Sequence, residues 1–227
     1  MIVYGKRIFA YLLERHIDKI ERVYVLKDLD PKVFGTLKKR GIRVVRIDNK
    51  KAQALAHGGN HQGVLIEIED FRFADFADLK ESDFLVLLHG ITDVGNIGSI
   101  VRTAYALGAD GIVVTGLKSL EMSGVVRRSS GAALDMPIAL KWNLLECIKE
   151  LQDRGVKVYA ADMGGEDLRR ERFASKRALV LGSEGEGIPR KALERSDKRL
   201  KIVMERDFDS LNVAAAAAIF IDRMRDE

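Results

Sequence analysis

The fold of the larger part of this chain is indicated by residues 84–108, which read FLVLLHGITDVGNIGSIVRTAYALG. The stretch begins with a continuous apolar run, Phe84 to Leu88, which is typical of a β-strand buried on both faces of a parallel sheet. A glycine-punctuated turn follows and leads into a segment with helical spacing that ends at Gly108. A buried strand that leads directly into a helix is the repeating unit of an α/β fold.

The same alternation continues to the end of the chain. The expected strands are residues 112–115, 156–160, 178–181 and 200–204, and the expected helices include residues 144–151 and 211–224. We therefore expect residues 84–227 to form a doubly wound α/β sheet that binds its ligands at the carboxyl ends of the strands.

Residues 1–70 show a smaller pattern of the same kind. Apolar residues recur at helical spacing over positions 8–13, and β-rich runs occupy residues 23–26, 42–47 and 64–68. Asp30-Pro31 and Asp48 indicate helix starts, because each aspartate stands at an expected N-cap. We expect a small α/β/α domain here, joined to the larger domain by a linker over residues 71–83.

The composition limits the class of protein. An apolar content of 47% and a net charge of +4 exclude intrinsic disorder. A single cysteine excludes a disulfide framework and fits a reducing compartment. No apolar stretch reaches the roughly 18 residues that span a bilayer, and the first residues lack a signal-peptide pattern. We therefore expect a cytoplasmic protein with no membrane partner.

The positive charge is concentrated in the first third of the chain. Residues 1–70 carry 14 Lys and Arg against 9 Asp and Glu, whereas residues 71–227 carry 24 against 25. This bias fits a domain that faces a nucleic acid. The same bias fits equally well a domain whose basic side chains only cover solvent-exposed helix faces.

A polar loop over residues 57–63, His-Gly-Gly-Asn-His-Gln-Gly, precedes the last β-rich run of this domain. Its two histidines have no cysteine or carboxylate at ligand spacing, so we expect no metal site. Asn60, His61 and Gln62 are candidates for hydrogen bonds to RNA bases or phosphates.

The common enzymes of the α/β class are excluded by their missing signatures. The glycines at 90, 95 and 98 do not form the dinucleotide fingerprint, which argues against a nicotinamide-dependent oxidoreductase. The sequence also lacks the P-loop, the G-x-S-x-G nucleophile elbow and the H-E-x-x-H zinc motif.

Three further segments each follow an expected strand. They are residues 93–104, the glycine-rich residues 181–189, and residues 202–218, which contain Ser210-Leu211-Asn212 and an alanine run. Each segment alone is ordinary structure, whereas their joint order and spacing are specific.

In this order the segments resemble motifs one, two and three of the SpoU (TrmH) family of RNA ribose 2′-O-methyltransferases, in the SPOUT superfamily. The resemblance covers residues 84–227. Residues 1–70 resemble the substrate-binding domain of the branch that methylates a guanosine of 23S rRNA. The resemblance implies a deep trefoil knot in the C-terminal domain, a homodimer, and S-adenosylmethionine as the cofactor.

The resemblance also implies the site residues, and it implies no metal. The implied catalytic residues are Asn96, Arg102, Glu184, Ser210 and Asn212. The implied cofactor-binding residues are Thr115, Gly116, Gly182, Ile202, Met204 and Leu211, and Ser130-Gly131-Ala132 matches a further family segment near the active site.

The chemistry suggests a role for each catalytic group. Family proposals make the arginine of motif one the base, but a guanidinium stays protonated in proteins. We expect Arg102 instead to bind a phosphate and stabilise the developing alkoxide. Asn96 and Asn212 would fix Arg102, the ribose or the methionine end of the cofactor, and Glu184 would hold Arg102 in position. The proton acceptor would be either a phosphate oxygen or water.

The sequence departs from the family pattern at four positions. Val94 and Val203 replace a usual proline, Arg206 stands where glycine is common, and Ala214 replaces a frequent serine. These changes fall in or beside the cofactor loops. Two other functions remain open, namely ribose methylation of transfer RNA and a catalytically silent RNA-binding protein on the same fold.

Overall fold

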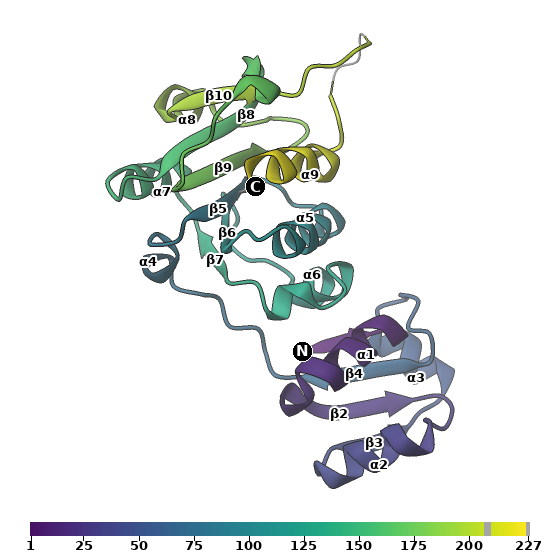
Figure 1. Ribbon diagram of the computed structural model, residues 1–227. Helices are drawn as coiled ribbons and strands as arrows, with labels where there is room; N and C mark the ends of the chain where they lie inside the picture. The colour runs from purple at the N-terminus through teal and green to yellow at the C-terminus, as the bar shows by residue number, and fades with distance from the viewer. Residues whose placement is uncertain (207–209, 226–227) are drawn as a thin grey trace. The chain divides into compact units, whose positions relative to one another are not determined.

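The computed structural model describes residues 1–206 and 210–225 (Figure 1). The chain forms two compact units. The first comprises residues 1–72 together with residues 122–131, and the second comprises the rest.

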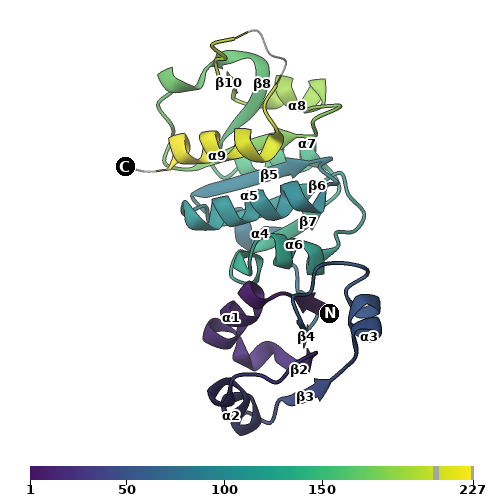
Figure 2. The same cartoon turned by 90° about the vertical axis from the view of Figure 1, so that its right-hand side faces the viewer.

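The first unit is a four-stranded sheet with helices on both faces. The strands lie in the order β1-β4-β2-β3, with β2 and β3 parallel and the other neighbours antiparallel. Helices α1 and α2 cover one face and α3 covers the other (Figure 2). The elements are β1 (Ile2–Tyr4), α1 (Lys6–Arg15), β2 (Ile20–Val25), α2 (Pro31–Lys39), β3 (Arg43–Arg46), α3 (Asn49–Leu55), β4 (Val64–Ile68) and α6 (Met122–Arg128), with a 3₁₀ turn at Ile17–Lys19.

The two helix starts expected in this unit are confirmed. Asp30 accepts hydrogen bonds from the N–H groups of Lys32 and Val33, and Pro31 is the first residue of α2. Asp48 accepts from the N–H of Lys51 at 2.7 Å and so caps α3. Strand β1 was not expected, because three residues are too few to show a period; its antiparallel pairing with β4 produces it.

The second unit is built on a six-stranded sheet in which every neighbouring pair is parallel. The strand order is β10-β8-β9-β5-β6-β7. The elements are α4 (Phe76–Leu79), β5 (Phe84–His89), α5 (Val94–Ala106), β6 (Gly111–Thr115), β7 (Ile138–Lys141), α7 (Leu144–Gln152), β8 (Lys157–Asp167), β9 (Arg177–Gly182), α8 (Arg190–Arg195), β10 (Lys198–Lys201) and α9 (Val213–Met224), with 3₁₀ turns at Ala132–Leu134 and Leu168–Arg170.

Helices cover both faces of this sheet. On one face, α4, α7 and α8 bury side chains such as Leu79, Ile148 and Ala192 in a common core with the strands. On the other face, α5 and α9 lie side by side (Figures 1 and 2). The expected doubly wound α/β fold is therefore confirmed.

Three strands differ from their expected ranges. Strand β7 was not expected, because its four residues lie at the sheet edge and only half of them are buried. Strand β8 continues through residues 161–167 with polar residues, and β10 begins at Lys198, two residues before the expected start. Both differences follow from the pairing of β8 with β10: Lys198 and Arg199 lie opposite Tyr159 and Ala160, and Leu200 and Lys201 lie opposite Glu166 and Asp167 in the extension.

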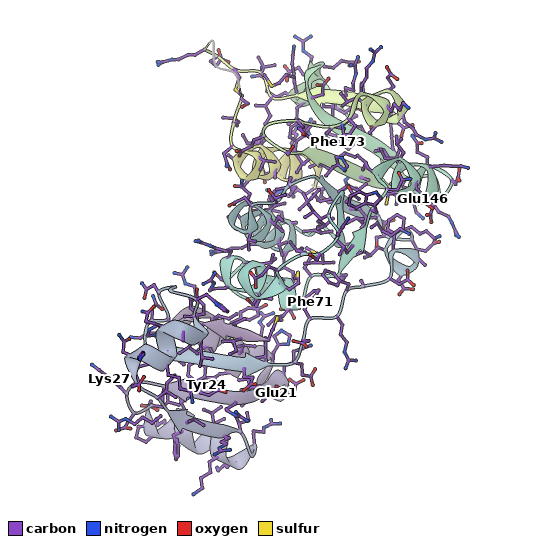
Figure 3. All side chains as sticks on the ribbon, turned by 180° about the vertical axis from the view of Figure 1, so that it is seen from behind. Glu21, Tyr24, Lys27, Phe71, Glu146 and Phe173 are labelled. Carbon is purple, nitrogen blue, oxygen red and sulfur yellow. The ribbon has the colours of Figure 1, made fainter. Side chains whose placement is uncertain are left out.

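Aromatic and arginine side chains stabilise β8 and the start of β9. The ring of Phe173 meets that of Tyr159 edge-on, with centroids 5.0 Å apart; Phe173 is labelled in Figure 3. Arg177 is 2% exposed, and its Nε donates to the carbonyl of Met224 at 2.6 Å. The last turn of α9 is thereby fastened to the start of β9.

Two neighbouring backbone segments lie in direct contact in this unit. A Cβ atom built on Gly165 would lie 2.5 Å from the backbone of Arg199 and Leu200. Only glycine permits this approach of the β8 extension to β10.

We predict that Gly165→Ala destabilises the protein by about 1–3 kcal/mol, because the new methyl group must displace backbone atoms. Gly185→Ala is the matched control, since a Cβ at Gly185 meets nothing within 4 Å. Thermal melts followed by circular dichroism measure the difference. Equal midpoints for the two variants would contradict this close contact between β8 and β10.

Candidate functional site

The candidate site lies at the carboxyl ends of the central strands of the second unit. The parallel register places His89 at the end of β5 opposite Gly182 on β9 and opposite Thr115 on β6. The loops that follow these strands therefore leave the sheet along one edge, which is where open α/β sheets bind their ligands.

One asparagine joins three of the loops at this edge. The Nδ2 of Asn212 donates to Oδ1 of Asn96 at 3.0 Å and to Oε1 of Glu184 at 2.8 Å. The backbone N–H of Val213 donates to the same Glu184 oxygen at 3.2 Å. Asn96 lies in the first turn of α5, Glu184 in the loop after β9, and Asn212 directly before α9.

The other end of the same amide caps helix α9. Oδ1 of Asn212 accepts from the N–H groups of Ala214 and Ala215, at 3.0 and 3.4 Å. The amide orientation follows from this arrangement, because its oxygen meets donors and its nitrogen meets acceptors. Asn212 thus serves as both an N-cap and a bridge between loops.

The remaining two expected catalytic residues lie outside these hydrogen bonds. Arg102 is exposed on α5, about 9 Å along the helix axis from Asn96 and about 120° around it. Ser210 is exposed at the rim of the cavity described below. The described bonds of Glu184 run to Asn212 and Val213, so the expected contact of Glu184 with Arg102 stays a prediction.

A cavity of about 220 Å³ opens beside this cluster. It is enclosed by the middle of β8, by the ends of β9 and β10 with the loops that follow them, and by α9, and most of its lining is apolar. Four of the six expected cofactor residues line it, namely Gly182, Ile202, Met204 and Leu211, together with Glu184 and Ser210.

Thr115 and Gly116 are not among the described residues that line this cavity. Thr115 is fully buried, and its Oγ1 lies 2.9 Å from Nδ1 of His89. Burial lowers the pKa of His89, and the opposing effect of the Glu186 charge is smaller. The imidazole is therefore neutral at neutral pH. Sequence reasoning did not single out His89, which lies between the two glycine loops at residues 116 and 182.

The structure adds three residues that the sequence reasoning missed. Ala161, Asp162 and Met163 line the cavity directly after the expected end of β8 at Ala160. Their place at the carboxyl end of an apolar strand is the signal that marks them. Asp162 is held there by Arg199, with 3.6 Å between Oδ2 and Nη1.

Two of the three polar-loop side chains suggested as RNA contacts form bonds within the first unit, and their contact with RNA stays a prediction. His61 is 6% exposed, and its Nδ1 accepts from the N–H of Gly63 at 3.1 Å. Oε1 of Gln62 accepts from the N–H of Lys6 at 2.9 Å. These two side chains stabilise the loop and the start of α1, whereas Asn60 is exposed.

Two findings bear on metals and membranes. In residues 1–206 and 210–225, no group of three or more His, Cys, Asp or Glu side chains is placed to hold a metal ion. No helix in that part of the chain is both long enough and apolar enough to cross a membrane.

Burial raises the pKa of the Cys147 thiol to about 12, which makes this cysteine a poor nucleophile.

Two protein families match consecutive parts of the chain. The family described as SpoU rRNA Methylase matches residues 83–222. The family described as RNA 2′-O ribose methyltransferase substrate binding matches residues 2–74.

Individual relatives match over most of their lengths. The chain is 34% identical to the 23S rRNA (guanosine-2′-O-)-methyltransferase RlmB of Ralstonia nicotianae, over 79% of this chain and 75% of that protein. It is 29% identical to the protein of the same name from Vibrio vulnificus, over 96% and 93%. The crystal structure of an AdoMet-bound rRNA methyltransferase from Sinorhizobium meliloti superposes with a TM-score of 0.82 at 26% identity, covering 98% of this chain and 85% of that one.

The first family match spans more than half of the chain and contains the cavity and the hydrogen-bonded cluster. The chain therefore belongs to the SpoU rRNA methylase family of RNA 2′-O-ribose methyltransferases.

Proposed function

We propose that this enzyme transfers a methyl group from S-adenosylmethionine to the ribose 2′-hydroxyl of a guanosine in 23S rRNA. The observation that carries the proposal is the hydrogen-bonded cluster of Asn96, Glu184 and Asn212, of which Glu184 lines the cavity. Relatives named for this reaction match 96% of the chain, including the residues of the substrate-binding family, which supports the ribosomal substrate.

The residues of the cavity fit the cofactor. Leu211, Met204 and Ile202 offer apolar surface to a nucleoside, and Glu184 and Ser210 offer polar atoms at its rim. Gly182 permits a close backbone turn, since a Cβ there would lie 2.2 Å from the carbonyl carbon of Gly187. When bound, the cofactor supplies an electrophilic methyl group.

The cluster keeps the polar wall of the cavity in one position. Glu184 is fixed by two N–H donors, and Asn212 is fixed by its four hydrogen bonds. Groups that are already oriented need no reorganisation during reaction, which is how positioning lowers a barrier.

Arg102 has the electrostatic role in this proposal. Its guanidinium remains protonated, so it acts as a donor and not as a base. It binds the phosphate next to the target ribose and stabilises the negative charge that develops on the 2′-oxygen.

The two family matches suggest a separate function for each part of the chain. We propose that residues 1–70 bind RNA, that residues 71–83 form the linker, and that residues 84–227 form the methyltransferase domain. The net charge of +5 on residues 1–70 supports the first part. We further propose that the methyltransferase domain contains the trefoil knot that the family resemblance implies. A ribosomal RNA substrate is in keeping with a cytoplasmic enzyme.

Methyl transfer from labelled S-adenosylmethionine tests the proposal directly. Unmodified 23S rRNA and bulk transfer RNA serve as substrates, with a chelator present, and the labelled nucleoside is mapped. Label on a guanosine ribose of 23S rRNA is expected. Label on transfer RNA alone, or on a base, would contradict the proposal.

We predict a homodimer. Ile219 on α9 and Tyr105 on α5 are 42% and 37% exposed, and the two helices are neighbours. Burial of this apolar surface by a second copy of the chain would stabilise a dimer. Sedimentation at micromolar concentration is expected to give about twice the chain mass of 25.3 kDa. A single species at the chain mass would show that the protein is a monomer.

We predict that Arg102→Ala slows methyl transfer by about 10²-fold or more, the usual effect of losing one charge-stabilising donor. Arg102→Lys is expected to restore little of the lost rate, because lysine lacks the planar group that binds a phosphate through two hydrogen bonds. Single-turnover rates and calorimetric titration with S-adenosylhomocysteine measure both effects. Cofactor affinity is expected to stay unchanged, and near-normal rates in Arg102→Lys would refute the role.

We predict that Asn212→Ala lowers both stability and methyl transfer. Asn143→Ala is the matched control, because Asn143 caps α7 in the same unit and lies outside the cluster. Each variant is expected to lose about 1 kcal/mol of stability, but only Asn212→Ala is expected to lose cofactor affinity. Equal cofactor affinity in the two variants would show that Asn212 acts only as a helix cap and does not support the cavity.

A further inference from the structure

The first unit contains a cavity of its own, of about 590 Å³, which shares no lining residue with the cofactor cavity. Three parts of the unit enclose it: the start of α1, the polar loop at residues 57–62, and the end of α6. We call it the arginine cavity, because Arg7, Arg127 and Arg128 line it.

The arginine cavity is strongly positive. Its lining contains three arginines and His57, and none of the described residues that line it is an aspartate or a glutamate. Cations gathered around one opening repel one another, so this arrangement costs free energy until an anion enters.

Arg127 is held in place before any ligand arrives. Its guanidinium carbon lies 4.1 Å from the centroid of the Tyr4 ring, within the range of a cation–π interaction. The side chain is half-buried, and its pKa is lowered first by burial and second by the charge of Arg128. Arg127 is therefore a preoriented cation whose charged form an anion would stabilise.

The backbone of α1 adds to this potential. The N-cap residue of α1, Gly5, has no side chain, Gln62 accepts from the N–H of Lys6 alone, and the first-turn residues Arg7 and Ile8 line the cavity. The N-terminal end of a helix carries partial positive charge.

We propose that the arginine cavity binds a phosphodiester of the RNA backbone. The inference rests on the proposed function for its substrate and adds a site to it. Arginine forks match the oxygens of a phosphate group in pairs. Contacts of this kind fix the position and orientation of a nucleic acid and carry no sequence information. The cavity therefore holds the RNA by its backbone, while the reacting guanosine is selected elsewhere.

The test compares three charge-removing variants of the full chain, Arg127→Gln, Arg128→Gln and the double variant. Arg195→Gln is the control, because Arg195 is an exposed arginine at the end of α8 that lines neither cavity. Filter binding to an unmodified 23S rRNA transcript is measured from 50 to 200 mM salt, beside thermal melts and titration with S-adenosylhomocysteine.

Each cavity variant is expected to bind the transcript several-fold more weakly. The slope of log affinity against log salt should fall by about 0.7–0.9 for each phosphate that the variant no longer neutralises. Arg127→Lys, which keeps the charge, should retain the wild-type slope even if its side chain no longer stacks on Tyr4. Cofactor affinity and the affinity of Arg195→Gln for RNA should not change.

Unchanged slopes in the cavity variants, or an equal loss in Arg195→Gln, would overturn the proposal. Binding of inorganic phosphate with no change in the RNA slopes would identify a small-anion site and would also overturn it. A wild-type chain that binds the transcript but does not methylate it would refute the proposed function. The salt slopes of the variants would still show whether the arginine cavity binds the RNA backbone. A wild-type chain that does not bind 23S rRNA would refute both.

Discussion

The candidate active site depends on the side-chain amide of Asn212. Its nitrogen donates to Asn96 and Glu184, and its oxygen accepts from the N–H groups of Ala214 and Ala215, the second and third residues of α9. Segments more than a hundred residues apart in sequence are thereby joined through one planar group. Hydrogen bonds in such a network are worth more together than singly, because each one orients the next. The junction fixes Glu184, which lines the candidate cofactor cavity.

The parallel sheet brings these segments within reach of that amide. Because every strand of the second unit runs the same way, the loops after β5, β8, β9 and β10 leave from one edge. The close contact at Gly165 lets β8 lie against β10 beside Leu200, which lines the cavity, and Arg177 fastens the end of α9 to the start of β9. These contacts help to place the segments that Asn212 joins.

The sequence predicted the parts that depend on local signals. The buried run at Phe84–Leu88 and the helix caps at Asp30 and Asp48 appear where expected, since continuous apolar residues and N-cap side chains act over short distances. Strand β7 and the extension of β8 were missed, because pairing with distant strands forms them. The residues of the site were predicted from a family resemblance. The hydrogen bond between Asn212 and Glu184, which are 28 residues apart, leaves no pattern in the sequence and could not be predicted. The segment at residues 207–209 in motif three lies outside the described residues.

A double-mutant cycle on Glu184 and Asn212 tests this account most directly. Calorimetry gives the dissociation constant of S-adenosylhomocysteine for the wild type, Glu184→Ala, Asn212→Ala and the double variant. If the amide joins the loops into one cavity, the double variant loses less affinity than the two single losses combined, with a coupling of about 1 kcal/mol or more. Losses that add to within about 0.3 kcal/mol would show that the two side chains act independently and would contradict the account.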